Sequence, residues 1–278
     1  MTREAIEAAV AEGRMGDRLW LYATYHCNLA CVYCLTESHP GIARRRRLSD
    51  ETMLRAAREA KELGFASVGV TGGEVFMLPS FPDLLAELSA ILPTIALTNA
   101  TLFTEKLLVR LEPLAGRDVA LQISLDSDVP ARNDEFRGPE NFAKVVDAVP
   151  RLVDRGIKVR LQTTVEYQTE EELERVCALH RSWGIADDDH IVRPVVRRGR
   201  AAVEDLGVEP GPLDILPELT LTADGAFLHP FAPTVRHGVT DLDLLVSRQI
   251  LPLEVPAGKL RRIVAGLPVG DDVRRNIR

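Results

Sequence analysis

Short apolar runs alternate with amphipathic segments along residues 18–196. The apolar runs are rich in β-branched and aromatic residues, as strands are, and apolar residues recur at helical spacing between them. One predicted helix is well delimited, because Ser49 precedes two acidic residues and Gly64 follows its last turn. The predicted strands cover residues 18–25, 66–71, 95–98, 119–125, 157–165 and 190–196, and the predicted helices cover residues 50–63, 81–92, 104–111, 139–156 and 170–183.

Strict alternation of strands and helices predicts right-handed crossovers and a parallel sheet. Six such units suit an α/β fold of the partial barrel type, (β/α)6, better than a closed eight-stranded barrel. We expect Pro150 to kink or interrupt the helix that contains it. The expected organisation is a short helical segment at 1–17, the partial barrel at 18–202, and a linker with a small C-terminal hairpin and helix extension at 203–278.

Composition narrows the class of protein. The chain has 278 residues, of which 46% are hydrophobic and 27% are charged, as expected for a soluble globular protein. Its net charge of −7 argues against general binding to nucleic acid or to anionic membranes. The N-terminus lacks the apolar core of a signal peptide, and no apolar run is long enough to span a membrane. We therefore expect a cytoplasmic protein with no nucleic-acid or membrane partner.

Three of the four cysteines lie within eight residues, as Cys27, Cys31 and Cys34. The C-x3-C-x2-C spacing directly follows the first predicted strand, and three thiolates on one loop can hold a [4Fe–4S] cluster with one iron left open. A zinc site with His26 or His39 as fourth ligand is an alternative, although zinc sites usually pair two C-x2-C units. A chance grouping of core cysteines is the other alternative.

The cysteine motif, with Tyr33 before its last cysteine, resembles the signature of the radical S-adenosylmethionine (radical SAM) superfamily. Later segments resemble further motifs of that family in the same order, each after a predicted strand. One of them departs from the family pattern, because Asn133 stands where the family has histidine. These segments are Thr71-Gly72-Gly73-Glu74, Thr98-Asn99-Ala100, Ile123-Ser124-Leu125-Asp126, Asn133-Asp134-Glu135-Phe136-Arg137-Gly138, Gln162-Thr163-Thr164-Val165, Arg193-Pro194 and Gly199-Arg200-Ala201.

The resemblance implies two cofactors, one [4Fe–4S] cluster and S-adenosylmethionine (SAM), which together generate a 5′-deoxyadenosyl radical that abstracts hydrogen from a substrate. It places the SAM amino group at Glu74 and the SAM carboxylate near Ser124 or Arg137. It also implies an electron donor such as flavodoxin or ferredoxin. The implied metal ligands are Cys27, Cys31 and Cys34, and the implied cofactor-binding residues are Tyr33, Gly72, Gly73, Glu74, Asn99, Ser124, Asp126, Arg137, Gln162 and Val192.

The C-terminal region resembles the opening of a SPASM or twitch extension. Alternating residues on both sides of Asp224-Gly225 predict a hairpin. His229-Pro230-Phe231 stands where such extensions carry Pro-Cys, and no cysteine follows Cys177, so the resemblance implies a lid without auxiliary clusters. A plain hairpin that caps the barrel is the alternative.

Other features have ordinary explanations. Cys177 is expected to be a buried core thiol and His180 a residue at a helix boundary. The run Arg44 to Arg47 is expected to be solvated, with screening of an anionic substrate as the alternative, and Arg193 is expected to face the site.

Three functions remain open. The first is a radical SAM enzyme acting on a small molecule such as a sugar, nucleoside or amino-acid derivative. This is favoured because the residues before the first strand are too few for a peptide-binding domain. The second is a maturase of a ribosomally made peptide. The third is an iron–sulfur and SAM-binding protein without catalysis.

Overall fold

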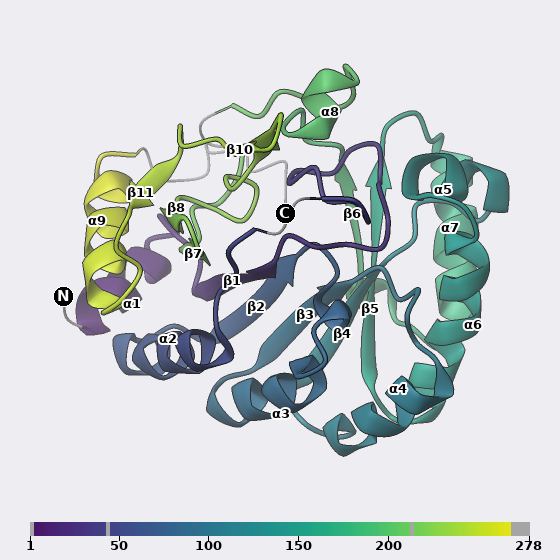
Figure 1. Cartoon of the computed structure of the whole chain (residues 1–278), viewed down its shortest axis with the longest axis horizontal. Coiled ribbons are helices and arrows are strands. Elements are labelled where there is room, and N and C mark those ends of the chain that lie inside the picture. Colours follow the sequence, from purple (N-terminus) through teal and green to yellow (C-terminus); the bar gives the residue numbers. More distant parts are fainter. Residues whose placement is uncertain (1–2, 43–44, 212–213, 268–278) are drawn as a thin grey trace.

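A computed structural model describes residues 3–42, 45–211 and 214–267. One sheet of nine strands, in the order β11-β8-β7-β1-β2-β3-β4-β5-β6, organises this part of the chain (Figure 1). Strands β1 to β6 are parallel to one another, as the alternating pattern predicts. These six strands are β1 (Arg18–Thr24), β2 (Ser67–Gly72), β3 (Thr94–Thr98), β4 (Val119–Ser124), β5 (Lys158–Val165) and β6 (His190–Pro194).

Helices cover the outer face of the curved sheet (Figure 1). The predicted capping of the first of them is confirmed, because the Ser49 side chain accepts a hydrogen bond from the Thr52 amide and Gly64 adopts a left-handed conformation. The helices of this layer are α2 (Asp50–Leu63), α3 (Phe81–Ile91), α4 (Glu105–Leu111), α5 (Pro130–Arg137), α6 (Asn141–Asp154) and α7 (Glu170–Ser182).

Two features of this layer differ from the sequence prediction. Helix α5 was not expected, because its residues are mostly polar and give no apolar periodicity. Helix α6 continues through Pro150, so the proline does not interrupt it. The loss of one backbone hydrogen bond there is offset because Val145, Val149 and Leu152 of the same helix are fully buried in the core.

The C-terminal hairpin extends the sheet beyond β1. Strands β7 (Thr220–Thr222) and β8 (Gly225–Phe227) form the expected hairpin, and β7 pairs in parallel with β1 at Trp20 and Leu21. Strand β11 (Leu245–Ser247) pairs with β8 at the edge. The hairpin therefore widens the barrel wall, which differs from the expected lid or cap.

The remaining elements are short or peripheral. Helix α1 (Arg3–Ala11) confirms the expected N-terminal helix and lies beside α9 (Glu254–Ala265) (Figure 1). Helix α8 (Arg200–Val203) follows β6, and β9 (Val235–Arg236) pairs with β10 (Val239–Thr240). Short 3-10 helices cover Val75–Met77, Glu112–Leu114 and Asp187–Asp189. None of the helices in the described ranges is long and apolar enough to cross a membrane.

Candidate active site

The loop that follows β1 carries the three clustered cysteines across the carboxyl ends of the parallel strands. Cys27 is buried, while Cys31 and Cys34 are partly exposed. The Cys27 sulfur accepts a hydrogen bond from the Leu29 amide at 3.4 Å and lies 3.7 Å from the Asn99 side-chain nitrogen. The Cys31 sulfur lies 3.6 Å from the Arg137 carbonyl oxygen. The loop thus brings the thiols next to the ends of β3 and α5.

Two glycines after β2 allow the start of this loop to approach closely. The Gly73 amide donates to the Thr24 carbonyl at 2.7 Å. A Cβ atom at Gly72 would lie 2.1 Å from the Thr24 carbonyl oxygen, and one at Gly73 would lie 2.1 Å from that of His26. Only glycine fits such contacts, so the Gly-Gly pair sets the path of the cysteine loop.

The segment after β6 holds the other end of the loop. The Arg200 amide donates to the Cys34 carbonyl at 2.9 Å, and its guanidinium donates to the carbonyls of Cys31 at 2.5 Å and Ser38 at 3.2 Å. A Cβ at Gly199 would lie 2.2 Å from the Leu35 carbonyl oxygen. Arg200 and Gly199 were not predicted as site residues, since their role depends on contacts made across the fold.

One cavity brings most of the predicted site residues together. Its empty volume is about 970 Å³, part of which is open to solvent, and a volume of that order suits a ligand of cofactor size. Thr164, Arg193 and Phe231 also line it; of these, only Arg193 was expected to face the site. The predicted residues in its wall are Cys27, Cys31, Tyr33, Cys34, Gly72, Gly73, Asn99, Ser124, Arg137 and Gln162.

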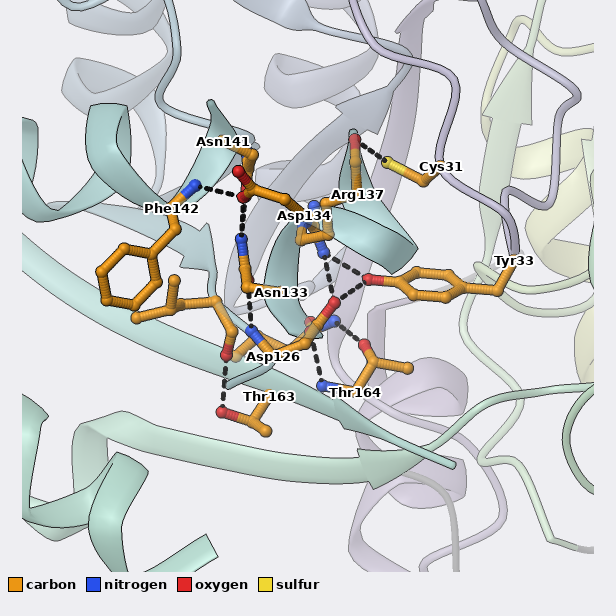
Figure 2. A network of polar contacts seen from close by, with 12 residues as sticks. Cys31, Tyr33, Asp126, Asn133, Asp134, Arg137, Asn141, Phe142, Thr163 and Thr164 are labelled. Atoms are coloured by element: carbon orange, nitrogen blue, oxygen red, sulfur yellow. Dashed lines mark hydrogen bonds and ion pairs between the residues drawn. The ribbon is translucent and has the colours of Figure 1, made fainter. Parts of the chain in front are cut away.

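Asp126 organises the polar wall of this cavity without lining it (Figure 2). Its side chain is buried and accepts hydrogen bonds from the Tyr33 hydroxyl, from Arg137 at 3.3 Å and from the Thr164 amide at 2.9 Å. Tyr33 also accepts a hydrogen bond from Arg137. Asp126 therefore fixes three neighbours that do line the cavity, Tyr33, Arg137 and Thr164.

Arg137 remains charged in this setting. Burial alone lowers the pKa of its guanidinium, but the nearby Tyr33 and Asp126 outweigh burial, so the net shift of the Arg137 pKa is upward. Its Nε atom is buried and has no hydrogen-bond partner among the described residues. A buried donor without a partner is costly, and it is therefore suited to an anionic ligand.

Asn133, the residue that departs from the motif, is hydrogen-bonded through both atoms of its side-chain amide. Its side-chain oxygen accepts from the Asp126 amide at 3.0 Å, and its side-chain nitrogen donates to Asn141 at 2.8 Å (Figure 2). Asp134 in turn accepts from the Phe142 amide at 2.8 Å. The segment thus joins the end of β4 to the start of α6 and positions Arg137 between them.

Glu74 does not line the cavity, and its predicted contact with the SAM amino group stays a prediction. Its carboxylate is buried and accepts from the Thr98 hydroxyl at 2.7 Å and from the Asn99 amide at 2.8 Å. It also accepts from the Phe76 amide at 3.0 Å. Burial raises the pKa of Glu74, while these hydrogen bonds act to lower it. Glu74 links the ends of β2 and β3 and positions Asn99.

Val192 is also not brought to the cavity. Successive side chains of a strand point to opposite faces, and its neighbours Ile191 and Arg193 line the cavities of the barrel interior. The Val192 side chain lies on the opposite face and is 43% exposed. Arg193 is therefore the β6 side chain that faces inward, and the predicted cofactor contact of Val192 stays a prediction.

The protein environment raises the pKa of two of the three thiols. Burial raises the pKa of Cys27 to about 12 and that of Cys31 to about 11. For Cys31 the nearby Arg137 acts in the opposite direction. Without a metal these thiols hold their protons at neutral pH, so iron binding must displace protons from them.

The three cysteines of the loop share one cavity. Within the described part of the chain, no three Cys, His, Asp or Glu side chains are grouped closely enough to hold one ion. The three cysteines nevertheless line a single cavity, where each can bind a different iron of one cubane. His26 and His39, the candidate fourth ligands of a zinc site, are not among the residues that line this cavity.

The remaining sequence expectations have mixed outcomes. Cys177 is partly exposed, not buried, and its sulfur lies 3.3 Å from the His190 ring. His180 lies within α7 and is buried against His190, with ring centroids 4.3 Å apart. Arg45 is bound rather than solvated, because it lies over the Tyr25 ring and 3.6 Å from Asp224. Arg46 is exposed, and Arg44 lies outside the described residues.

Fold and site together define the class: an α/β partial barrel with three cysteines on the loop after its first strand. The profile of the Radical SAM superfamily matches residues 21–179, more than half of the chain. The chain therefore belongs to the radical SAM superfamily and is a radical SAM enzyme. The cofactors of this superfamily are a [4Fe–4S] cluster and SAM.

Proteins of similar sequence align with about half of this chain. Molybdenum cofactor biosynthesis protein 1 of Mus musculus is 34% identical over 149 residues, 52% of this chain and 23% of that protein. The subtilosin biosynthesis protein AlbA of Bacillus subtilis (strain 168) is 32% identical over 51% of this chain and 32% of its own length. GTP 3′,8-cyclase of Clostridium perfringens is 28% identical over 55% of this chain and 48% of its own length. The chain thus spans less than half the length of these relatives.

A solved structure shares the fold. Streptococcus suis SuiB bound to S-adenosylmethionine superposes with a TM-score of 0.58 at 19% identity, over 69% of this chain and 44% of that one.

Proposed function

We propose that this chain cleaves SAM reductively and abstracts hydrogen from a small-molecule substrate held inside the barrel. The observation that carries the proposal is the single cavity that unites the three cysteines with Gly72 and Arg137. When bound, the cluster and SAM supply a 5′-deoxyadenosyl radical. The chain's own residues bind and orient the reactants and exclude water from them.

The residues of the cavity divide this work. Cys27, Cys31 and Cys34 would hold the cluster. The backbone at Gly72 and Gly73 leaves room for SAM to approach the strand ends. Ser124 and the unpartnered Nε of Arg137 are suited to the SAM carboxylate, since a charged donor strengthens such a hydrogen bond.

A small-molecule substrate is favoured by the barrel interior. A second cavity, with an empty volume of about 1180 Å³, continues from the first and shares Tyr22, Gln162, Arg193 and Phe231 with it. Its volume is of the order that encloses a small organic molecule. A peptide maturase is the second candidate, because AlbA is named for bacteriocin biosynthesis and SuiB was solved with its precursor peptide.

An external electron donor, such as flavodoxin or ferredoxin, completes the proposal. We also propose that the C-terminal region is related to SPASM or twitch extensions without auxiliary clusters, so that careful reconstitution gives about four irons per chain, the content of one [4Fe–4S] site. Eight irons per chain would contradict a single cluster.

The cluster assignment is tested by paired cysteine variants. Anaerobic reconstitution of Cys31→Ala should lose the absorbance at about 400 nm that arises from thiolate-to-iron charge transfer. Cys177→Ala is the matched control, because this thiol lies on α7 beside His190 and does not line the cavity. This variant should keep the absorbance. Full cluster content in Cys31→Ala would refute the assignment.

A further inference from the structure

Arg193 has a charge that the described residues do not neutralise. It lies on β6 in the wall shared by the two cavities, where Thr164 is its neighbour on β5. Among the described residues, no carboxylate oxygen lies within 4 Å of its guanidinium. The carboxylate of Asp126 acts to raise the pKa of Arg193, but this carboxylate is already bound to Arg137 and Tyr33.

The guanidinium is nevertheless held in place. With the Gln162 amide oxygen turned toward it, Nε and Nη2 of Arg193 donate to that oxygen at 2.8 and 2.7 Å. The Phe231 ring covers one face at 4.6 Å. These contacts orient the side chain but supply no negative charge, and a partly buried cation without a counter-ion is unfavourable. Burial accordingly lowers the pKa of Arg193 to about 10.

The second cavity has one further arginine in its described wall, and this one lies near an acidic group, Glu218. Its other arginine, Arg18, donates to the Ser67 hydroxyl at 3.1 Å and lies over the Trp20 ring at 5.4 Å. The acidic group of the cavity, Glu218, accepts from the Trp20 indole at 2.6 Å and would repel an anion from that end. The remaining wall includes apolar side chains such as Ile191 and Ile215.

We propose that Arg193 binds an anionic group of the substrate, a carboxylate or a phosphate, at the border between the two cavities, with the apolar part of the substrate in the second cavity. This inference rests on the proposed function and names the substrate class of the same site. An anchor at the border holds the substrate next to the cysteine-lined cavity, and fixed orientation of this kind accelerates a reaction between two bound partners.

Three small probes test the assignment by equilibrium dialysis of the reconstituted enzyme with SAM. Phenyl phosphate and benzoate carry a phosphate or a carboxylate on the same ring, and benzyl alcohol is their neutral counterpart. We expect at least one of the anions to bind while benzyl alcohol binds more weakly. Tighter binding of phenyl phosphate indicates a substrate with a phosphate group, and tighter binding of benzoate indicates a substrate with a carboxylate group.

Variants assign the binding to Arg193. Arg193→Gln should weaken anion binding roughly ten- to a hundredfold, the effect of losing a charge-assisted hydrogen bond. Arg193→Lys keeps the charge without the forked geometry and should weaken it less. Both variants should keep the parental affinity for SAM. Arg110→Gln, which removes an exposed arginine paired with Asp83, is the control and should change neither affinity.

Several results would overturn the proposal. With the parent enzyme, these results are equal binding of benzyl alcohol and the anions, or failure of both anions to bind. With Arg193→Gln, unchanged anion binding would contradict the proposal. Loss of SAM affinity in that variant would assign Arg193 to the cofactor instead. Failure of the proposed function is a separate result: a parent enzyme that binds an anion through Arg193 but forms no 5′-deoxyadenosine from SAM.

Discussion

At the scale of single residues, the two buried carboxylates of the site act through other residues. Glu74 positions Asn99, and Asp126 positions Tyr33 and Arg137. The sequence motif identified both acids, but it could not show whether they face the ligand or the protein. That distinction depends on the hydrogen-bond donors that neighbouring strands bring to them.

Asp126→Asn should destabilise the protein. The change leaves the Arg137 guanidinium without its charged partner, and breaking a buried ion pair in this way costs about 3–5 kcal/mol. Denaturant unfolding measures the difference. Asp83→Asn breaks an exposed pair with Arg110 and should cost about 0–1 kcal/mol. Equal effects of the two substitutions would contradict the role assigned to Asp126.

Gly73→Ala should prevent normal placement of the cysteine loop. Its new Cβ would lie 2.1 Å from the His26 carbonyl oxygen, so backbone next to Cys27 has to move. We expect reduced iron content after reconstitution, measured by a colorimetric iron assay. Gly266→Ala, where the nearest atom to a new Cβ is 3.7 Å away, should retain the parental iron content. Normal iron content in Gly73→Ala would show that the close approach is dispensable.

At the scale of elements, local patterns predicted the parallel strands and most of the helices. Ser49 and Gly64 delimit α2 by short-range capping, which the sequence displays directly. Helix α5 was not predicted, because polar residues such as Arg132 and Asp134 give it no apolar face. On β6 the prediction that Arg193 faces the site is confirmed, whereas the Val192 side chain lies on the opposite face of the strand.

The contact between α7 and β6 should make the fold sensitive to acid. Burial, with a smaller effect of His190, lowers the pKa of His180 from 6.5 to about 3. The unfolded chain therefore binds a proton on His180 that the folded chain excludes. The stabilising effect of the neutral ring is present above pH 6.5 and is lost as the pH falls toward 3.

A variant without this ring tests the acid effect. His180→Leu should lose less stability between pH 7 and pH 5 than the parent, by about 2 kcal/mol at pH 5. Urea unfolding at the two pH values gives the difference. Parallel loss of stability in parent and variant would contradict the assignment of this acid sensitivity to His180.

At the scale of the whole molecule, the position of the C-terminal hairpin could not be predicted. The Asp224-Gly225 turn identifies the hairpin, but nothing in its local sequence specifies pairing with β1, which is nearly 200 residues away. This placement brings Phe231 to the barrel interior and closes the wall beside Trp20. The second cavity is therefore formed by Arg18 and Trp20 together with residues of the C-terminal region such as Phe231, which sequence motifs between residues 18 and 196 do not reveal.

The central claim is that this chain generates 5′-deoxyadenosine from SAM at a cluster held by Cys27, Cys31 and Cys34. The most direct measurement is chromatographic detection of 5′-deoxyadenosine after the reconstituted protein is incubated with SAM and dithionite. We predict product with the parent protein and with Cys177→Ala, and none with Cys31→Ala. A parent protein that holds its cluster and binds SAM but forms no product would contradict the claim and favour a non-catalytic SAM-binding role.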